Sequence, residues 1–132
     1  MKLSISKEGT FVPSFNGNKE LPATDQITVR YRTPTLAIKN RCRKKPQAKG
    51  IASANGSIDR MEIIIEKDEI TTLNEMLISI SNCSYGGSDG KELVITNAQE
   101  LINAPIDFES LLKEIVEEFD RLLDHSGINE KN

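Results

Sequence analysis

Few side chains in this 132-residue sequence are of the types that perform covalent chemistry, and their spacing assembles no catalytic group. The single histidine, His125, has Asp124 and Ser126 as its immediate neighbours. A Ser–His–acid triad draws its members from separate elements that converge, whereas adjacent helical residues point about 100° apart. Placement near a helix C-terminus, where the helix dipole favours a cation, explains His125 without catalysis. The sequence therefore predicts no catalytic residue and a protein that is not an enzyme.

The two cysteines, Cys42 and Cys83, are far apart and belong to no metal-binding motif. Zinc sites use three or four closely spaced Cys and His ligands, so we predict no metal site and no cofactor. Two isolated cysteines do not make the disulfide framework of a secreted domain, and residues 1–8 lack the apolar run of a secretory signal. We expect a cytoplasmic protein with reduced thiols. Cys42, between two arginines, is interpreted as an incidental thiol, with a lowered pKa as the alternative.

The densest charge cluster is a basic run between residues 39 and 49. A run of this kind can neutralise phosphates, but this one has no aromatic residues for base stacking and no recognition helix after it. We interpret it as a solvated loop or as a docking segment for an acidic partner, including a second copy of the chain. Nucleic acid is the less favoured partner. The candidate partner-binding residues of this basic loop are Lys39, Arg41, Arg43, Lys44, Lys45 and Lys49.

The whole-chain net charge of −3 hides two halves of opposite charge. Residues 1–60 contain twelve Lys or Arg and four acidic residues, a net charge of +8, whereas residues 61–132 contain five and sixteen, a net charge of −11. Hydrophobic residues make up 37% of the chain, and no stretch approaches the roughly 18 apolar residues that cross a bilayer. The composition predicts one soluble globular domain without a membrane partner, and the opposite charges permit head-to-tail homo-oligomers.

Strand patterns dominate the beginning of the chain. Apolar and polar side chains alternate over residues 27–32, as in a half-buried strand that Pro34 ends. Short strands are also expected at residues 4–7 and 10–12. Residues 16–18 form an Asn-Gly-Asn turn signal, because both residue types tolerate positive φ.

Helical spacing of apolar residues begins in the second half of the chain. Residues 70–80 carry Ile, Leu and Met side chains at this spacing, and Thr72 with Glu75 has the form of a capping box. The three consecutive isoleucines within residues 61–66 are consistent with either a buried strand or the start of a helix.

Shorter elements follow. We expect a loop at residues 84–90 and a short strand at residues 92–96. Asn97 and Glu100 form a second capping box, which opens a short helix that Pro105 ends.

The last helix gives the strongest pattern. Asp107 is its expected N-cap, Ile106 and Leu111 its hydrophobic staple, and Gly127 its left-handed stop. Such a stripe is usually core, but it could also extend beyond what the domain covers and bind a partner helix. The stripe consists of Phe108, Leu111, Leu112, Ile115, Val116, Phe119, Leu122 and Leu123. The candidate partner-binding residues in it are Phe108, Leu112, Ile115, Phe119 and Leu122.

One motif near the N-terminus has the form F-x-P-x-F-x-G-N-x-x-L-P. It consists of Phe11, Pro13, Phe15, Gly17, Asn18, Leu21 and Pro22. Together with residues 25–29, 77–82 and 111–116 it resembles small proteins of phage and prophage tail-gene clusters, and the resemblance fails between residues 39 and 60. Members of that group are often regarded as tail assembly chaperones. The resemblance implies a small protein that coats the aggregation-prone tape-measure helix until tail-tube subunits displace it.

These patterns together predict an α+β fold, in which a small antiparallel sheet from the N-terminal half packs on two or three helices from the C-terminal half. The single domain, residues 1–132, would comprise a strand-rich part, a mobile basic loop, a mainly helical part and a tail. The expected bounds of these parts are 1–38, 39–57, 58–127 and 128–132.

The predicted function is non-enzymatic phage tail assembly in the host cytoplasm, with the tape-measure protein as the expected partner. Two alternatives remain at this point. One is a structural minor tail or head–tail joining component of the virion. The other is a nucleic-acid-binding regulator that uses the basic loop.

Overall fold

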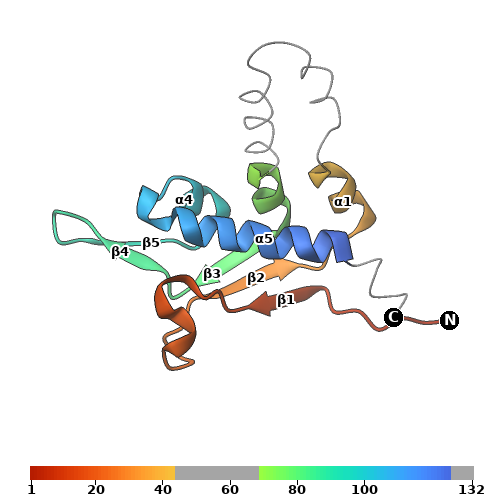
Figure 1. Cartoon of the computed structure of the whole chain (residues 1–132), viewed down its shortest axis with the longest axis horizontal. Helices are drawn as coiled ribbons and strands as arrows, with labels where there is room; N and C mark the ends of the chain where they lie inside the picture. Colours follow the sequence, from red (N-terminus) through yellow and green to blue (C-terminus); the bar gives the residue numbers. More distant parts are fainter. Residues whose placement is uncertain (44–68, 126–132) are drawn as a thin grey trace, which may run out of the picture.

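A computed structural model describes residues 1–43 and 69–125 of the chain. Three antiparallel strands, β1 (Glu8–Phe11), β2 (Thr28–Arg32) and β3 (Leu77–Ser81), form a sheet in the order β1-β2-β3. All the labelled helices lie on one side of this sheet (Figure 1). The fold is therefore α+β with an antiparallel sheet, as predicted, although its third strand comes from the second half of the chain.

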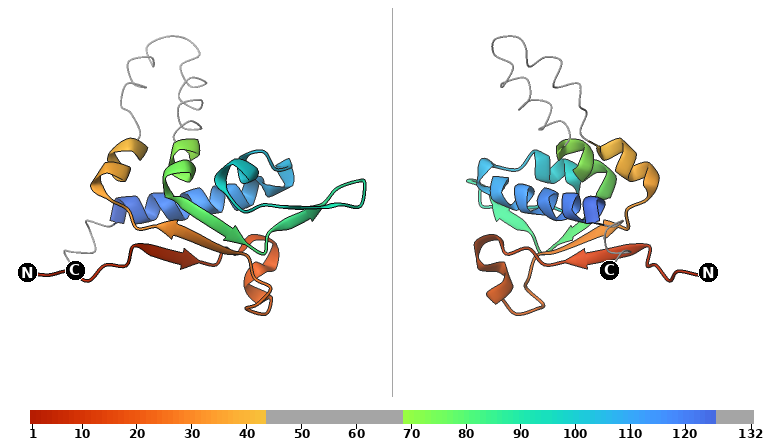
Figure 2. Two further views of the ribbon diagram at one scale, coloured as in Figure 1. Left: turned by 180° about the vertical axis from the view of Figure 1, so that it is seen from behind. Right: turned by 45° about the vertical axis from the view of Figure 1, so that its right-hand side comes forward.

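The helical layer contains one long helix and several short ones. The long helix, α5 (Glu109–His125), runs along the sheet and follows a 3₁₀ turn, η2 (Ile106–Phe108). The shorter members are α1 (Leu36–Cys42), α4 (Ala98–Ile102) and a helical segment over residues 69–76. Two further views show the same separation of helices and sheet (Figure 2).

The core is formed where α5 faces the sheet. Phe119, fully buried, makes edge contacts with Phe11 of β1 at 6.1 Å and with Tyr31 of β2 at 5.8 Å between ring centroids. Val29 is also buried, whereas Arg30 between Val29 and Tyr31 is exposed. The predicted alternation over residues 27–32 is therefore confirmed. Burying a large apolar side chain of this kind favours folding by about 1.5–3 kcal/mol.

A second, two-stranded sheet extends from one end of the molecule (Figure 1). It pairs β4 (Ser84–Gly86) with β5 (Glu92–Val94). The strand predicted near residues 92–96 is confirmed, but the loop predicted from residue 84 begins only after β4. Tyr85 explains the extra strand, because its ring packs against Phe108 at 5.5 Å and fixes β4 beside the helical layer.

The helix predicted through residue 80 instead ends at residue 76, and Leu77–Ser81 pairs with β2. The ladder aligns Val29 with Ile80 and Tyr31 with Leu77, which leaves Ile78 as an extra, bulged residue. A bulge changes the alternation of faces, so Leu77 and Ile80, three apart, are both buried. The buried residues of this strand are therefore three apart, a spacing that is typical of a helix.

The capping box predicted at Thr72 and Glu75 is wrong for the same segment. Thr72 lies inside the helical residues 69–76 and is buried, with no position at a helix start.

The loop predicted for residues 39–57 is wrong at its beginning, because residues 39–42 belong to α1. Thr35 caps this helix through its side chain, which accepts a hydrogen bond from the Ile38 backbone N–H at 3.1 Å. Ile38 and Cys42, four residues apart, are both buried. The remainder of the predicted loop, residues 44–57, lies outside the described residues.

Residues 10–11 belong to β1 as predicted, but residues 4–7 form no strand. Continuing the β1–β2 register places Ser6 opposite Pro34. β2 ends before Pro34 and the chain turns into α1 from Leu36, so β2 does not continue alongside residues 4–6. The segment therefore has a strand sequence and no partner strand among the described residues.

The prediction for α4 is confirmed, since the Asn97 side chain accepts a hydrogen bond from the Glu100 backbone N–H at 2.8 Å. The Glu100 carboxylate reaches one residue further back than a capping box requires. It accepts from the Thr96 N–H and from the Thr96 hydroxyl, each at 2.7 Å.

The predicted beginning of the last helix is wrong in detail. Asp107 lies within η2 and is not an N-cap, and Ile106 is 81% exposed, so it makes no staple with Leu111. The 3₁₀ turn after Pro105 turns Ile106 outwards. Three of the predictions fall outside the described residues: the stop at Gly127, the tail at residues 128–132 and the segment 61–66.

The two halves of the chain are not separate structural units. The second half, predicted as mainly helical over residues 58–127, supplies β3, β4 and β5. Because β2 lies between β1 and β3, the sheet joins the basic half to the acidic half.

Candidate functional site

The motif that carries the family resemblance folds as a tight loop containing the 3₁₀ segment η1 (Phe15–Glu20). Asn16 and Gly17 have φ values of 48° and 74°, the left-handed conformation that these two residue types tolerate best. The predicted turn at residues 16–18 is confirmed.

Asn18 holds this loop closed with one side chain that is only 2% exposed. Its amide nitrogen donates to the carbonyl oxygens of Pro13 at 2.8 Å and Ile27 at 3.0 Å, and its amide oxygen accepts from the Ile27 N–H at 2.6 Å. This one side chain therefore gives hydrogen-bond partners to backbone groups on both sides of the loop, as a neighbouring strand would.

Other residues of the motif also stabilise the fold. Phe11 contacts the core ring Phe119, Phe15 stacks on Phe108 at 5.8 Å between ring centroids, and Pro13 is buried. Leu21 and Pro22 are exposed. The motif thus specifies a folded loop, and most of its side chains pack or form hydrogen bonds within the chain.

The apolar stripe of α5 is divided between core and surface. Ile115 and Phe119 are 0% exposed, so neither residue offers a surface to a partner, and that part of the prediction is wrong. Phe119 packs against Phe11 and Tyr31 of the sheet. Leu122 is half-buried against the same core. Phe108 and Leu112, near the start of α5, are half-buried and line an open depression.

This depression, which we call the α4–α5 groove, has a volume of about 230 Å³. A Lys113–Glu69 ion pair of 3.3 Å closes one side of it, and the strongly exposed Ile106 forms a prominent apolar contact point. The apolar lining consists of Leu101, Ile102, Ala104, Pro105, Ile106, Phe108 and Leu112, and the charged rim of Glu69, Glu109 and Lys113.

The sequence predicted two of these lining residues, Phe108 and Leu112, and missed the contribution of α4 and η2. The sequence predicts a staple role for Ile106 and no role for Ile102. The signal for the groove is Pro105, which interrupts helical structure between α4 and α5. Apolar side chains therefore lie on both sides of this interruption.

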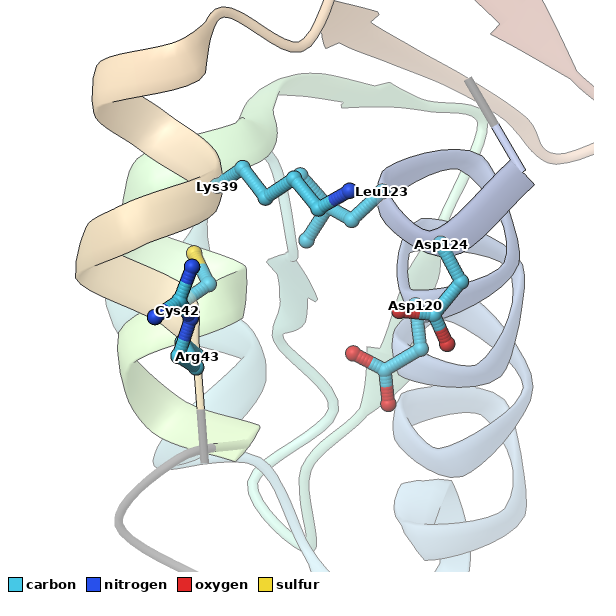
Figure 3. A pocket seen from close by; sticks show the side chains of 6 residues that line it. All are labelled: Lys39, Cys42, Arg43, Asp120, Leu123 and Asp124. Atoms are coloured by element: carbon cyan, nitrogen blue, oxygen red, sulfur yellow. The ribbon is translucent and has the colours of Figure 1, made fainter. Parts of the chain in front are cut away.

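Two of the basic-loop residues that the structure describes line a cavity together with acidic residues of the same chain (Figure 3). Lys39 and Arg43 lie on the α1 side of a cavity of about 230 Å³, and Asp120 and Asp124 lie on the α5 side. Arg41 donates to Glu75 at 2.7 Å, and this contact lowers the pKa of the Glu75 carboxyl. The other predicted basic-loop residues, Lys44, Lys45 and Lys49, are outside the described residues.

Cys42 lines the same cavity but is not an activated thiol. Burial raises the pKa of the Cys42 thiol, and a hydrogen bond with Thr72 lowers it by a smaller amount. The lowered pKa considered from the sequence is therefore wrong. The hydrogen bond also gives the buried Thr72 hydroxyl a polar partner.

Within residues 1–43 and 69–125, no three Cys, His, Asp or Glu side chains come together in a way that could hold a metal ion. None of the helices in these ranges has the length and apolarity that crossing a membrane requires.

Comparison with protein-family models, curated protein sequences and solved structures finds no match for this chain.

Proposed function

We propose that this chain is a non-enzymatic phage tail assembly protein, a chaperone that covers apolar helical segments of the tape-measure protein in the host cytoplasm. The observation that carries the proposal is the α4–α5 groove, with its apolar lining and charged rim. The motif resemblance supplies the identity of the client.

An amphipathic helix presents apolar side chains at positions i, i+3, i+4 and i+7, and such a helix binds in apolar grooves between helices. The groove here is short and open, and Ile106 in its lining is 81% exposed. These features suit reversible binding, which a chaperone needs because tail-tube subunits must later take over the client. The charged rim of Glu69, Glu109 and Lys113 can contact the polar side of the same helix.

A defined probe tests the groove directly. A fluorescent 20-residue peptide with a Leu stripe at helical spacing should bind the chain, and Ile106→Ser should weaken binding at least about tenfold, because removing one buried large apolar side chain costs about 1.5–3 kcal/mol. Fluorescence anisotropy measures the affinity. Leu36→Ser is the matched control, since Leu36 is 83% exposed on α1, outside the groove.

Co-expression tests the biological client. The tape-measure protein that the proposal names as the client should be more soluble with the chain than without it, and Ile106→Ser should remove most of the gain. Equal solubility in all cases would contradict the chaperone function. Detection of the chain in purified virions by mass spectrometry would favour the structural alternative, because a chaperone leaves the finished particle.

A further inference from the structure

The outer edge of β1 is free among the described residues. β1 is an end strand of the sheet, and the Lys7 carbonyl oxygen accepts from the Thr33 N–H at 2.9 Å. Alternation along an antiparallel ladder then directs the backbone groups of Gly9 and Phe11 towards β2. The N–H and C=O groups of Glu8 and Thr10 face outwards, where they can receive another strand.

The segment before β1 has the sequence of a strand that lacks a neighbouring strand among the described residues, and only its last residue, Ser6, is held, by a hydrogen bond that its carbonyl oxygen accepts from the Thr33 hydroxyl. Residues 1–6 are all exposed and lie beyond β1 at one end of the molecule (Figure 1). Leu3 and Ile5, which are 64% and 67% exposed, alternate with polar residues. We call residues 1–6 the arm. Large apolar side chains in an extended, exposed arm are stabilised when a second sheet edge covers them.

We propose that the arm of one copy pairs antiparallel with β1 of a second copy, and that the second arm does the same in return. The two three-stranded sheets would then form one six-stranded sheet about a two-fold axis, with every contact made twice.

Charge excludes two registers, and among the others the one with Ser6 on the two-fold axis pairs the arm with all of β1, Glu8–Phe11. Pairing that aligns the two Lys7 residues, or the two Glu8 residues, places like charges directly opposite each other, which is unfavourable. With Ser6 on the two-fold axis, Ser4 lies opposite Glu8 of the second copy and no like charges are paired. Leu3 then lies opposite Gly9, and Met1 lies opposite Phe11.

The surface beside β1 suits this arm. Leu3 would lie next to the ring of Tyr31, which covers Gly9 so closely that a Cβ there would be 2.5 Å from Tyr31 Cζ. An open hollow of about 550 Å³ adjoins the edge, with three carboxylates and two cations on its walls. The lining residues are Phe11, Val12, Lys19, Glu114, Glu117, Glu118 and Arg121.

The oligomeric state of the full chain tests the pairing. Sedimentation equilibrium should show a concentration-dependent dimer, and Leu3→Ser with Ile5→Ser should weaken dimerisation at least tenfold. Thr10→Pro should do the same, because it removes an outward N–H that β2 does not use. Leu36→Ser and Ile106→Ser should leave the dimer unchanged.

Cross-linking tests the register. Ser6→Cys should form a disulfide-linked dimer on mild oxidation, because a directly opposed pair has Cα atoms about 5.5 Å apart. Ser4→Cys should not, since it faces Glu8 of the other copy. A chain that stays monomeric, a dimer insensitive to the arm and edge variants, or a dimer lost with Ile106→Ser would each overturn the proposal. The last result would place the second copy in the α4–α5 groove.

Discussion

Asn18 fixes the loop between β1 and β2 with a single amide that bonds backbone groups on both sides of it. Its neighbours in the motif, Asn16 and Gly17, supply the left-handed backbone that brings this amide inwards. The motif therefore encodes a loop conformation, and proteins that share it would share that loop.

Asn18→Ala should reduce the free energy of unfolding by roughly 2–4 kcal/mol, because buried N–H and C=O groups of Ile27 and Pro13 lose their partner. Urea denaturation followed by circular dichroism measures the change. Asn74→Ala is the control, because Asn74 is exposed on the helical residues 69–76 and such surface changes stay within about 0.5 kcal/mol. Equal effects of the two substitutions would contradict the role given to Asn18.

The two buried cysteines make stability depend on alkaline pH. Burial raises the pKa of the Cys42 and Cys83 thiols, so the unfolded chain ionises first, at the ordinary value of about 8.5. The contribution of the two thiols to stability should be constant below that value and fall as pH rises above it.

Thermal unfolding between pH 7 and 10 measures this fall, and Cys42→Ala with Cys83→Ala should flatten the alkaline limb. Both thiols should also react with a disulfide reagent far more slowly in the native protein than in urea. Native reaction at the rate of free cysteine would show that the thiols are accessible.

At the scale of elements, the sequence predicts a feature correctly where residues within that element determine it. The Asn97 cap, the stop at Pro105 and the stripe of α5 are all local features. The helix–strand boundary at residue 77 could not be predicted, because the bulge at Ile78 gives β3 the spacing of a helix. Only pairing with β2, which lies far away in the sequence, decides the outcome.

For a related reason, only part of the lining of the α4–α5 groove can be predicted from the sequence. Phe108 and Leu112 follow from the periodicity of one helix, but which part of a stripe stays uncovered depends on the elements that pack against it. Ile115 and Phe119 are buried in the core, whereas Phe108 and Leu112 line the groove near the start of the helix.

Asn97→Ala should destabilise the chain by about 1 kcal/mol, the usual cost of removing an N-cap. Gln99→Ala, at an exposed position two residues later, is the matched control. Because α4 carries Leu101 and Ile102, the cap variant should also weaken peptide binding in the groove, while the control should not. Denaturation curves and anisotropy titrations on the same two variants distinguish these effects.

At the scale of the whole molecule, the charge difference between the halves does not correspond to two separate faces. Lys39 and Arg43 lie across a cavity from Asp120 and Asp124, and Arg41 binds Glu75. Part of the basic cluster is thus placed against the acidic half of its own chain. An interaction with an external partner has to compete with these internal contacts.

Phe119→Ala should cost about 3–5 kcal/mol, because it opens a cavity where α5 meets both β1 and β2. Arg41→Gln should cost less than about 1 kcal/mol, since its pair with Glu75 is largely exposed. Guanidinium denaturation ranks the two. A larger loss for Arg41→Gln would mean that ion pairs, and not the apolar contact between sheet and helix, hold the layers together.

The central position of β2 also affects how the chain reaches its fold. β2 pairs with β1 through a short connection, as Phe11 opposite Val29 shows, but with β3 across a long one, as Thr28 opposite Ser81 shows. Closing a long loop lowers the rate of folding, whereas each doubling of loop length costs only about 0.6 kcal/mol of stability. Variation in the length of the intervening stretch should therefore alter how fast the sheet is completed much more than how stable it is.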